Sequence, residues 1–112
     1  MTLPLPFKAG QLVVLVLKEP RERIWGRLLG LEAAGIALRG IDVNPWEEVI
    51  GFVRRGDADL AALGTRFLPM HRVESLYLDE PSSGVHSLSE DFERRTGRNP
   101  LDFLADRSLL PE

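Results

Sequence analysis

Cysteine is absent from this chain of 112 residues, so the protein can form neither a disulfide bond nor a thiolate metal site. Histidine is scarce as well, because only His71 and His86 are present and no carboxylates stand around them in a metal-binding spacing. Ser75 follows His71 closely, but nothing around it resembles a nucleophile elbow, and no phosphate-binding glycine motif occurs. We therefore predict a protein without enzymatic activity, cofactor or metal.

Long apolar runs are also missing. The longest run, Leu12 to Leu17, is far shorter than the ~20 residues that a membrane-spanning helix requires. Residues Met1 to Phe7 have no basic segment before an apolar stretch, and Pro4 and Pro6 interrupt them, so they do not predict a signal peptide. We expect a cytoplasmic protein that does not contact membranes.

Basic residues are not in excess. The chain holds 14 lysines and arginines against 17 acidic residues, which gives a formal net charge of −3. The acidic excess lies in residues 79–112, whereas residues 1–78 are nearly neutral. The strongly basic surface of a nonspecific nucleic-acid-binding protein is therefore missing, although a local basic patch remains open. The acidic tail is a candidate surface for a protein partner.

The residues that are present predict a single, mainly β domain. Hydrophobic residues make up 44% of the chain, which is enough for a real core. Short runs of apolar and β-branched residues follow one another closely, with glycine or proline at their bends. We expect strands over Gln11–Lys18, Ile24–Glu32, Gly35–Val43, Thr65–Pro69 and Val73–Asp79. Such a series predicts a small β-barrel, and its first strand, apolar on both faces, should be covered on both sides.

Glycine placement in the second strand predicts a bend. Gly26 and Gly30 are four residues apart, so on a regular strand they share a face, where glycine permits a close backbone approach. Gly35 ends a hairpin tip and is able to take a positive φ there. Trp25 lies on the face opposite to Gly26, and packing or an interface is a better interpretation for it than a base-stacking platform.

Residues 44–64 are expected to be inserted between the third and fourth strands. Asn44 can cap a helix whose first position is Pro45, since proline fits the first helical turn. Residues 49–53 fit the end of that helix or another strand, and both alternatives stay open. Residues 54–63 contain glycine and two aspartates and predict an exposed insertion.

Residues 81–112 predict a helical C-terminal appendage. Ser87 followed by Glu90 has the pattern of a capping box, and Gly97 is typical of a helix end. A second short helix is expected after Gly97. Phe92 is the aromatic residue through which this tail would pack on the strands.

The stretch from Gly10 to Leu78 resembles the Sm-like (LSm/Hfq-like) family. Gly26, followed by Leu28, stands where the family has a glycine in its second strand, and Glu32–Ile36 matches the turn after it. The fourth and fifth strands of the family match Thr65–Met70 and Val73–Leu78. The resemblance implies a strongly bent five-stranded, SH3-like barrel over residues 10–80, preceded by a segment over residues 1–9.

The resemblance also implies an assembly. In the family, the fourth strand of one subunit pairs with the fifth strand of its neighbour, which closes a homo-oligomeric ring. Pairing of that kind would remove the free strand edges that a small sheet must protect. The interface residues implied for this chain are Phe67, Leu68, Leu76 and Leu78.

Two functions follow from the resemblance and its departures. RNA binding, as a chaperone or scaffold, would use His71, which matches a family histidine, with Arg72 and Arg39 as further contacts. The chain departs from the family pattern, because Glu32–Ile36 lacks the base-contacting asparagine, and proline and methionine precede His71 in place of an aromatic residue and a lysine. A protein-interaction or structural ring without RNA binding is therefore the alternative, and both stay open.

Overall fold

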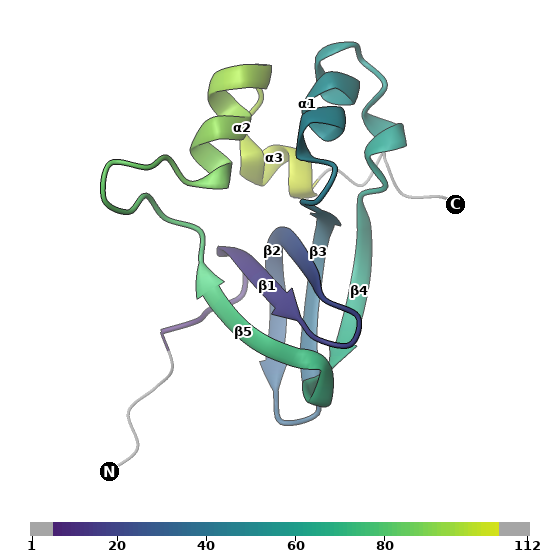
Figure 1. The fold of residues 1–112 in the computed structure, drawn as a ribbon, viewed down its shortest axis with the longest axis vertical. Helices are drawn as coiled ribbons and strands as arrows, with labels where there is room; N and C mark the ends of the chain where they lie inside the picture. The colour runs from purple at the N-terminus through teal and green to yellow at the C-terminus, as the bar shows by residue number, and fades with distance from the viewer. Residues whose placement is uncertain (1–5, 106–112) are drawn as a thin grey trace.

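Five antiparallel strands and several short helices make up residues 6–105, the part of the chain that this computed structural model describes (Figure 1). The strands are β1 (Leu12–Leu17), β2 (Glu22–Glu32), β3 (Gly35–Asp42), β4 (Gly64–Pro69) and β5 (Val73–Leu78). The helices are α1 (Trp46–Arg54), α2 (Leu88–Thr96) and α3 (Pro100–Ala105), with two 3₁₀ helices, η1 (Ala58–Ala61) and η2 (Met70–Arg72). The expected mainly β class is confirmed. The N-terminal segment and the tail that the sequence predicts both extend beyond the described residues.

Strand β1 lies between β2 and β5 and is buried on both faces, as the sequence predicts. Val13, Leu15 and Leu17 contribute to a cluster on one face of the sheet, and Val14 to a cluster on the other. All four side chains are at most 1% exposed. Two separate apolar layers therefore meet at this one strand.

The cluster on the Val13 face, here called the inner cluster, draws its buried members from strands alone. Those members are Val13, Leu15, Leu17, Ile24, Leu28, Ile36, Leu38 and Leu68. Among residues 6–105, no α-helix contributes to this cluster, so the sheet itself must curl around it to exclude water. Figure 1 shows this curvature, since β5 crosses in front of the other strands.

The cluster on the opposite face, here called the outer cluster, joins the sheet to the helices. Its buried members are Val14, Trp25, Ile41, Val43, Val49, Ile50, Val53, Ala58, Ala61, Leu63, Phe92, Phe103 and Leu104. Figure 1 shows α1, α2 and α3 gathered at one end of the strands. At the other end of this face, toward the β2–β3 turn, none of the described helices lies over the strands.

Backbone pairing does not close the sheet into a barrel. The strand order is β4-β3-β2-β1-β5, so β4 pairs with β3 and β5 pairs with β1. The two edge strands are joined only by the short corner η2, which fits the very short connection that the sequence predicts. Both edges of the described sheet consequently remain free.

Of the two glycines predicted to permit a close backbone approach, Gly26 does so and Gly30 does not. Gly26 pairs with Gly40 across the two strands, and a Cβ added to Gly26 would lie 2.6 Å from the carbonyl oxygen of Arg39. The predicted shared face of Gly26 and Gly30 is wrong, because a bulge between Leu28 and Gly30 moves Gly30 to the opposite face. A Cβ on Gly30 would meet nothing within 4 Å.

The predicted hairpin tip joins β2 and β3, but Gly35 does not use its freedom to take a positive φ. Among the described glycines, positive φ angles occur at Gly10, Gly56, Gly84 and Gly97, and not at Gly35. Gly35 instead lies so close to β4 that a Cβ there would be 2.3 Å from the carbonyl oxygen of Leu68. The requirement for glycine at this position is therefore steric rather than conformational.

The inserted residues 44–64 form a helix that packs on the sheet. The N-cap of α1 is Pro45 rather than Asn44, and no side chain caps it. Residues 49–53, for which a helix and a strand are both open in the sequence, are helical. The exposed insertion predicted after them is partly buried, because η1 places Ala58 and Ala61 in the outer cluster.

The tail follows its local sequence pattern closely. Ser87 caps α2, with the reciprocal hydrogen bonds of a capping box to Glu90, and Gly97 ends the helix at a φ of 74°. Helix α3 is the predicted second helix. Within residues 6–105, no helix is long and apolar enough to span a membrane.

Candidate functional site

The corner between β4 and β5 lies against the β2–β3 turn. The backbone N–H of Met70 donates to the carbonyl oxygen of Ala34 at 3.0 Å, so the two turns are held together. His71 is exposed at this corner. The structure therefore brings together the two turns at which the resemblance implies RNA contacts. The imidazole of His71 is accessible there.

Arg72 serves as an internal tie rather than an accessible contact. Its guanidinium donates to the carbonyl oxygens of Lys18 and Pro20, at 3.2 and 2.7 Å. It also donates to a Glu22 carboxylate oxygen at 3.0 Å, and both side chains are less than a quarter exposed. The other Glu22 oxygen lies 3.9 Å from the guanidinium of Arg66 on β4. Glu22 thus links the β1–β2 turn electrostatically to η2 and to β4.

Arg39 is buried, apart from the other two predicted RNA contacts. It lies within β3, is 5% exposed, and donates from its guanidinium to the Thr65 hydroxyl at 3.3 Å. Thr65 stands near the start of β4, whereas His71 follows the end of that strand. At roughly 3.3 Å per strand residue, most of the length of β4 separates Arg39 from the corner.

The four predicted interface residues divide between the edges and the core. Phe67 on β4 is 53% exposed, whereas its neighbour Leu68 belongs to the inner cluster and is 3% exposed. Leu76 and Leu78 on β5 are partly buried against the same cluster. Tyr77, between them, is 41% exposed on the other face of the strand.

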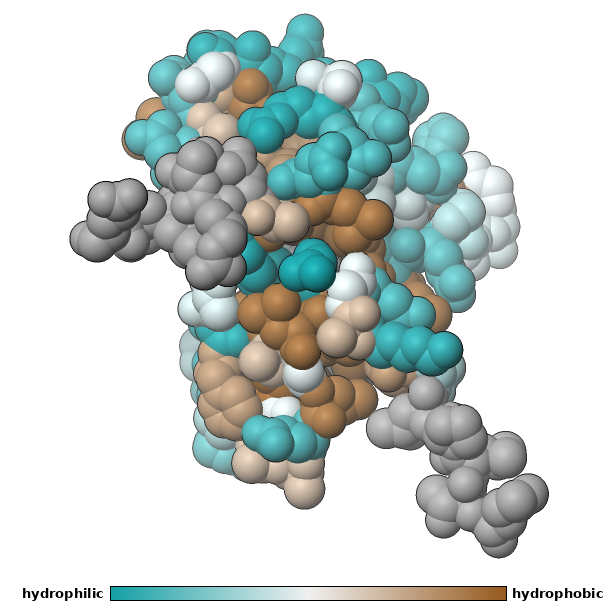
Figure 2. Space-filling view, turned by 180° about the vertical axis from the view of Figure 1, so that it is seen from behind, coloured by the Kyte–Doolittle hydropathy of each residue, from teal (hydrophilic) through white to brown (hydrophobic). Residues whose placement is uncertain are grey.

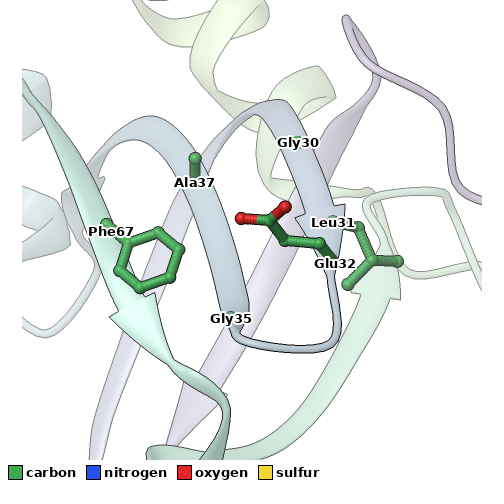
Figure 3. Close-up of a pocket in the computed structure, with 6 residues that line it drawn as sticks. All are labelled: Gly30, Leu31, Glu32, Gly35, Ala37 and Phe67. Atoms are coloured by element: carbon green, nitrogen blue, oxygen red, sulfur yellow. The ribbon is translucent and has the colours of Figure 1, made fainter.

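A shallow pocket that the sequence reasoning missed lies on the bare end of the outer face. Its volume is about 290 Å³, and it is lined by Gly30, Leu31, Glu32, Gly35, Ala37 and Phe67. Figure 3 shows the Glu32 carboxylate reaching over β3 toward the Phe67 ring. Small residues form the floor between these two side chains. We call it the Glu32 pocket.

Apolar residues are exposed on the strands. Figure 2 shows hydrophobic residues gathered over the strands, while most of the helical end is hydrophilic. Leu29, at the bulge, is 37% exposed and adds to the exposed apolar surface of β2. A sequence signal for the pocket exists in retrospect, since Gly30, Gly35 and Ala37 are small residues on paired strands. Their common face, however, depends on the bulge.

Another feature missed in the sequence is the anchoring of the tail by Asp79. One carboxylate oxygen of Asp79 accepts from the Trp25 indole N–H at 3.0 Å and from the Ser89 backbone N–H at 2.7 Å. The Ser89 hydroxyl donates to the same oxygen, and the backbone N–H of Leu88 donates to the other at 3.0 Å. Asp79 therefore joins β5, the start of α2 and β2.

Helices α1 and α2 are joined by a second polar network. Asp91 accepts from the Trp46 indole N–H at 2.9 Å and pairs with Arg95, which also bonds to Glu47 on α1. The hydrogen bond from Arg95 holds the pKa of Glu47 below its ordinary value. Burial tends to raise the pKa of Asp91, but hydrogen bonds from Trp46, Arg94 and Arg95 outweigh it, so that pKa is also lowered. The network therefore ties α2 to α1.

No known protein family, curated protein or solved structure matches this chain. A function for this chain is therefore inferred from the geometry of its described residues. That geometry offers two free strand edges, an exposed histidine at the corner and a shallow pocket on the outer face, and no group of three or more described residues is placed to hold a metal ion.

Proposed function

We propose that this protein is a non-catalytic assembly module, whose copies join by pairing β4 of one copy with β5 of the next to form an Sm-like ring. One observation carries the proposal: the described sheet ends in two free edge strands of equal length, six residues each. A free edge presents unpaired backbone donors and acceptors, and pairing with another copy satisfies them. A repeated β4–β5 contact is head-to-tail, so it either closes a ring or extends as a filament.

The faces of the two edge strands match. Leu68 on β4 faces the inner cluster, and so do Leu76 and Leu78 on β5. Phe67 and Tyr77 lie on the opposite faces of their strands and are both exposed. A continuous sheet through β4 and β5 of two copies would therefore keep leucine on one side and aromatic rings on the other.

The charges of the edges favour unlike rather than like pairing. The only charged residue of β4 is Arg66, and the only charged residue of β5 is Glu74. Pairing β4 with β4 would bring two arginines toward each other, and pairing β5 with β5 would do the same for two glutamates. Like charges that face each other across strands are destabilising, so β4–β5 pairing is preferred.

The assembly is tested by light scattering after size exclusion on the 12.5 kDa chain and on Phe67→Lys. We expect the wild type to have the mass of several subunits. The lysine should produce a folded monomer, because Phe67 is more than half exposed in the single chain and its loss leaves the inner cluster intact. The matched control is Leu60→Lys, which adds the same charge at a side chain that is 58% exposed on η1.

Two results would contradict the assembly proposal. A wild-type mass of one subunit across the micromolar range would remove it outright. An equal loss of mass in Phe67→Lys and Leu60→Lys would mean that added charge, and not the β4 edge, controls association. Far-ultraviolet circular dichroism on each variant separates loss of assembly from loss of folding.

A second function, binding of single-stranded RNA at the corner, is favoured by the exposure of His71 beside the β2–β3 turn. Because Arg72 and Arg39 are hydrogen-bonded inside the molecule, they would contribute little to contacts with RNA phosphates, and the affinity would be low. We expect His71→Ala to reduce the affinity for a short single-stranded RNA by severalfold, with the oligomer mass unchanged. His86→Ala is the control, since His86 is the only other histidine. Equal binding by both variants would exclude the corner.

A further inference from the structure

We propose that the Glu32 pocket receives an arginine side chain from a protein partner. Phe67 on the β4 edge belongs both to this pocket and to the assembly proposed above, whereas Gly30 and Glu32 on β2 belong to the pocket alone. Variants at Gly30 and Glu32 therefore test the pocket without touching the edge strands. Its volume of about 290 Å³ is at the low end for ligand pockets, which suits a single side chain better than a cofactor. The occupant is inferred from the chemistry of the two walls.

One wall is an aromatic face. Phe67 is 53% exposed, although a phenylalanine is normally covered, and its ring stands at the side of the pocket (Figure 3). A cation placed over such a ring is attracted by the ring quadrupole. Arginine uses this interaction more often than lysine, because its planar guanidinium also stacks on the ring.

The opposite wall is a carboxylate that extends into the pocket. Glu32 comes from the end of β2, and Figure 3 shows its carboxylate between the Phe67 ring and the Leu31 side chain. Within residues 6–105, no lysine or arginine forms an ion pair with Glu32. A guanidinium can donate two parallel hydrogen bonds to a carboxylate, and it would satisfy both walls at once.

The floor explains why a flat group fits. Gly30, Gly35 and Ala37 carry almost no side chain, so β2 and β3 present a nearly bare backbone surface between the walls. At Gly35, the close approach of β4 leaves no space for a Cβ. At Gly30, by contrast, a Cβ would meet nothing within 4 Å. Packing inside the molecule therefore does not require glycine at this position. Its absence of a side chain keeps the pocket open.

A nucleobase is the main competitor for this pocket, since it too can stack on Phe67. The phosphates that accompany a nucleobase would meet the negative charge of Glu32 and a chain with a net charge of −3. No positive side chain lines the pocket to offset that repulsion. The charge at this site therefore favours a cationic protein side chain.

The test is an NMR titration of the full-length protein, labelled with ¹⁵N, with the peptide acetyl-Gly-Arg-Gly-amide. The amide signals of Gly30, Gly35 and Ala37 are the reporters. The control peptide has citrulline in place of arginine, which keeps the shape and removes the charge. We expect saturable shifts with the arginine peptide, at a dissociation constant on the order of 1–10 mM for one exposed cation–π and ion-pair contact.

Two variants challenge the pocket directly. Glu32→Gln removes the charge, and Gly30→Val places a side chain on the floor, where a Cβ meets nothing within 4 Å. Each should weaken binding at least tenfold. Glu80→Gln changes the net charge equally at an exposed position outside the pocket, and it should bind like the wild type. Light scattering on Glu32→Gln should show the wild-type mass, so failure of this inference is distinguishable from failure of the assembly.

Several outcomes would overturn the inference. Equal shifts with the citrulline peptide would show that charge is not recognised. Shifts of the same amides by guanosine monophosphate, with none from the arginine peptide, would assign the pocket to a nucleobase. No saturable shift from the arginine peptide, or equal binding by Glu32→Gln and the wild type, would mean that the pocket does not receive a cation.

Discussion

Replacement of Phe92 by alanine is expected to lower the free energy of unfolding by about 3–5 kcal/mol, the range for a large buried aromatic residue. Phe92 is 0% exposed and is the side chain by which α2 enters the outer cluster. Its ring centroid lies 5.1 Å from that of Trp25 and 4.9 Å from that of Phe103. The substitution thus removes the main apolar contact of α2 with the sheet and its ring contact with α3.

Urea unfolding, followed by tryptophan fluorescence, measures this loss. Leu101→Ala is the matched control, because Leu101 lies on the same tail but is 44% exposed, and its loss should change stability by no more than about 0.5 kcal/mol. If Phe92→Ala unfolded at the same urea concentration as the wild type, the tail could not be part of the cooperative fold. Equal losses in both variants would instead mean that any truncation in the tail lowers stability, whether the side chain is buried or exposed.

Local chemistry accounts for the parts of this fold that the sequence predicts well. The capping box at Ser87 and the left-handed glycine at Gly97 depend on residues within one or two turns, so their patterns identify both ends of α2. Strand β1 is equally clear in the sequence, because a short run that is apolar on both faces and rich in β-branched residues is typical of a buried strand. Each of these features is decided by neighbours along the chain.

The parts that sequence reasoning missed depend on contacts between distant residues. The side of the sheet on which Gly30 lies is set by the bulge before it, and period-2 alternation cannot reveal an extra residue. In the sequence, nothing distinguishes Arg39 and Arg72 from arginines on the surface. In the structure, Arg39 is buried beside β4, and Arg72 is hydrogen-bonded to the β1–β2 turn. The Glu32 pocket combines β2, β3 and β4, so no single segment carries its pattern.

Replacement of Asp79 by alanine should be the most damaging single change of a polar residue, with a loss of about 2–4 kcal/mol. Hydrogen bonds to a charged acceptor are stronger than neutral ones. Alanine would remove the acceptor from two backbone N–H groups at the start of α2. It would also remove one of two acceptors of the Trp25 indole N–H, which would keep the Ser89 hydroxyl at 2.9 Å. The helix would keep its own cap at Ser87 but would lose its attachment to β5. Asp79→Asn, which retains one oxygen acceptor, should show a smaller loss.

Glu80→Ala provides the control for charge, since Glu80 is the neighbouring acidic residue and is exposed. Stability from urea unfolding should then fall in the order Glu80→Ala, Asp79→Asn and Asp79→Ala, with the first close to the wild type. The order should persist in 1 M salt, because salt screens exposed charges much more than partly buried hydrogen bonds. A loss that disappeared in salt, or equal effects of the two alanine variants, would contradict the anchor. In that case Phe92 and the outer cluster alone would hold the tail, and the carboxylate of Asp79 would only orient the start of α2.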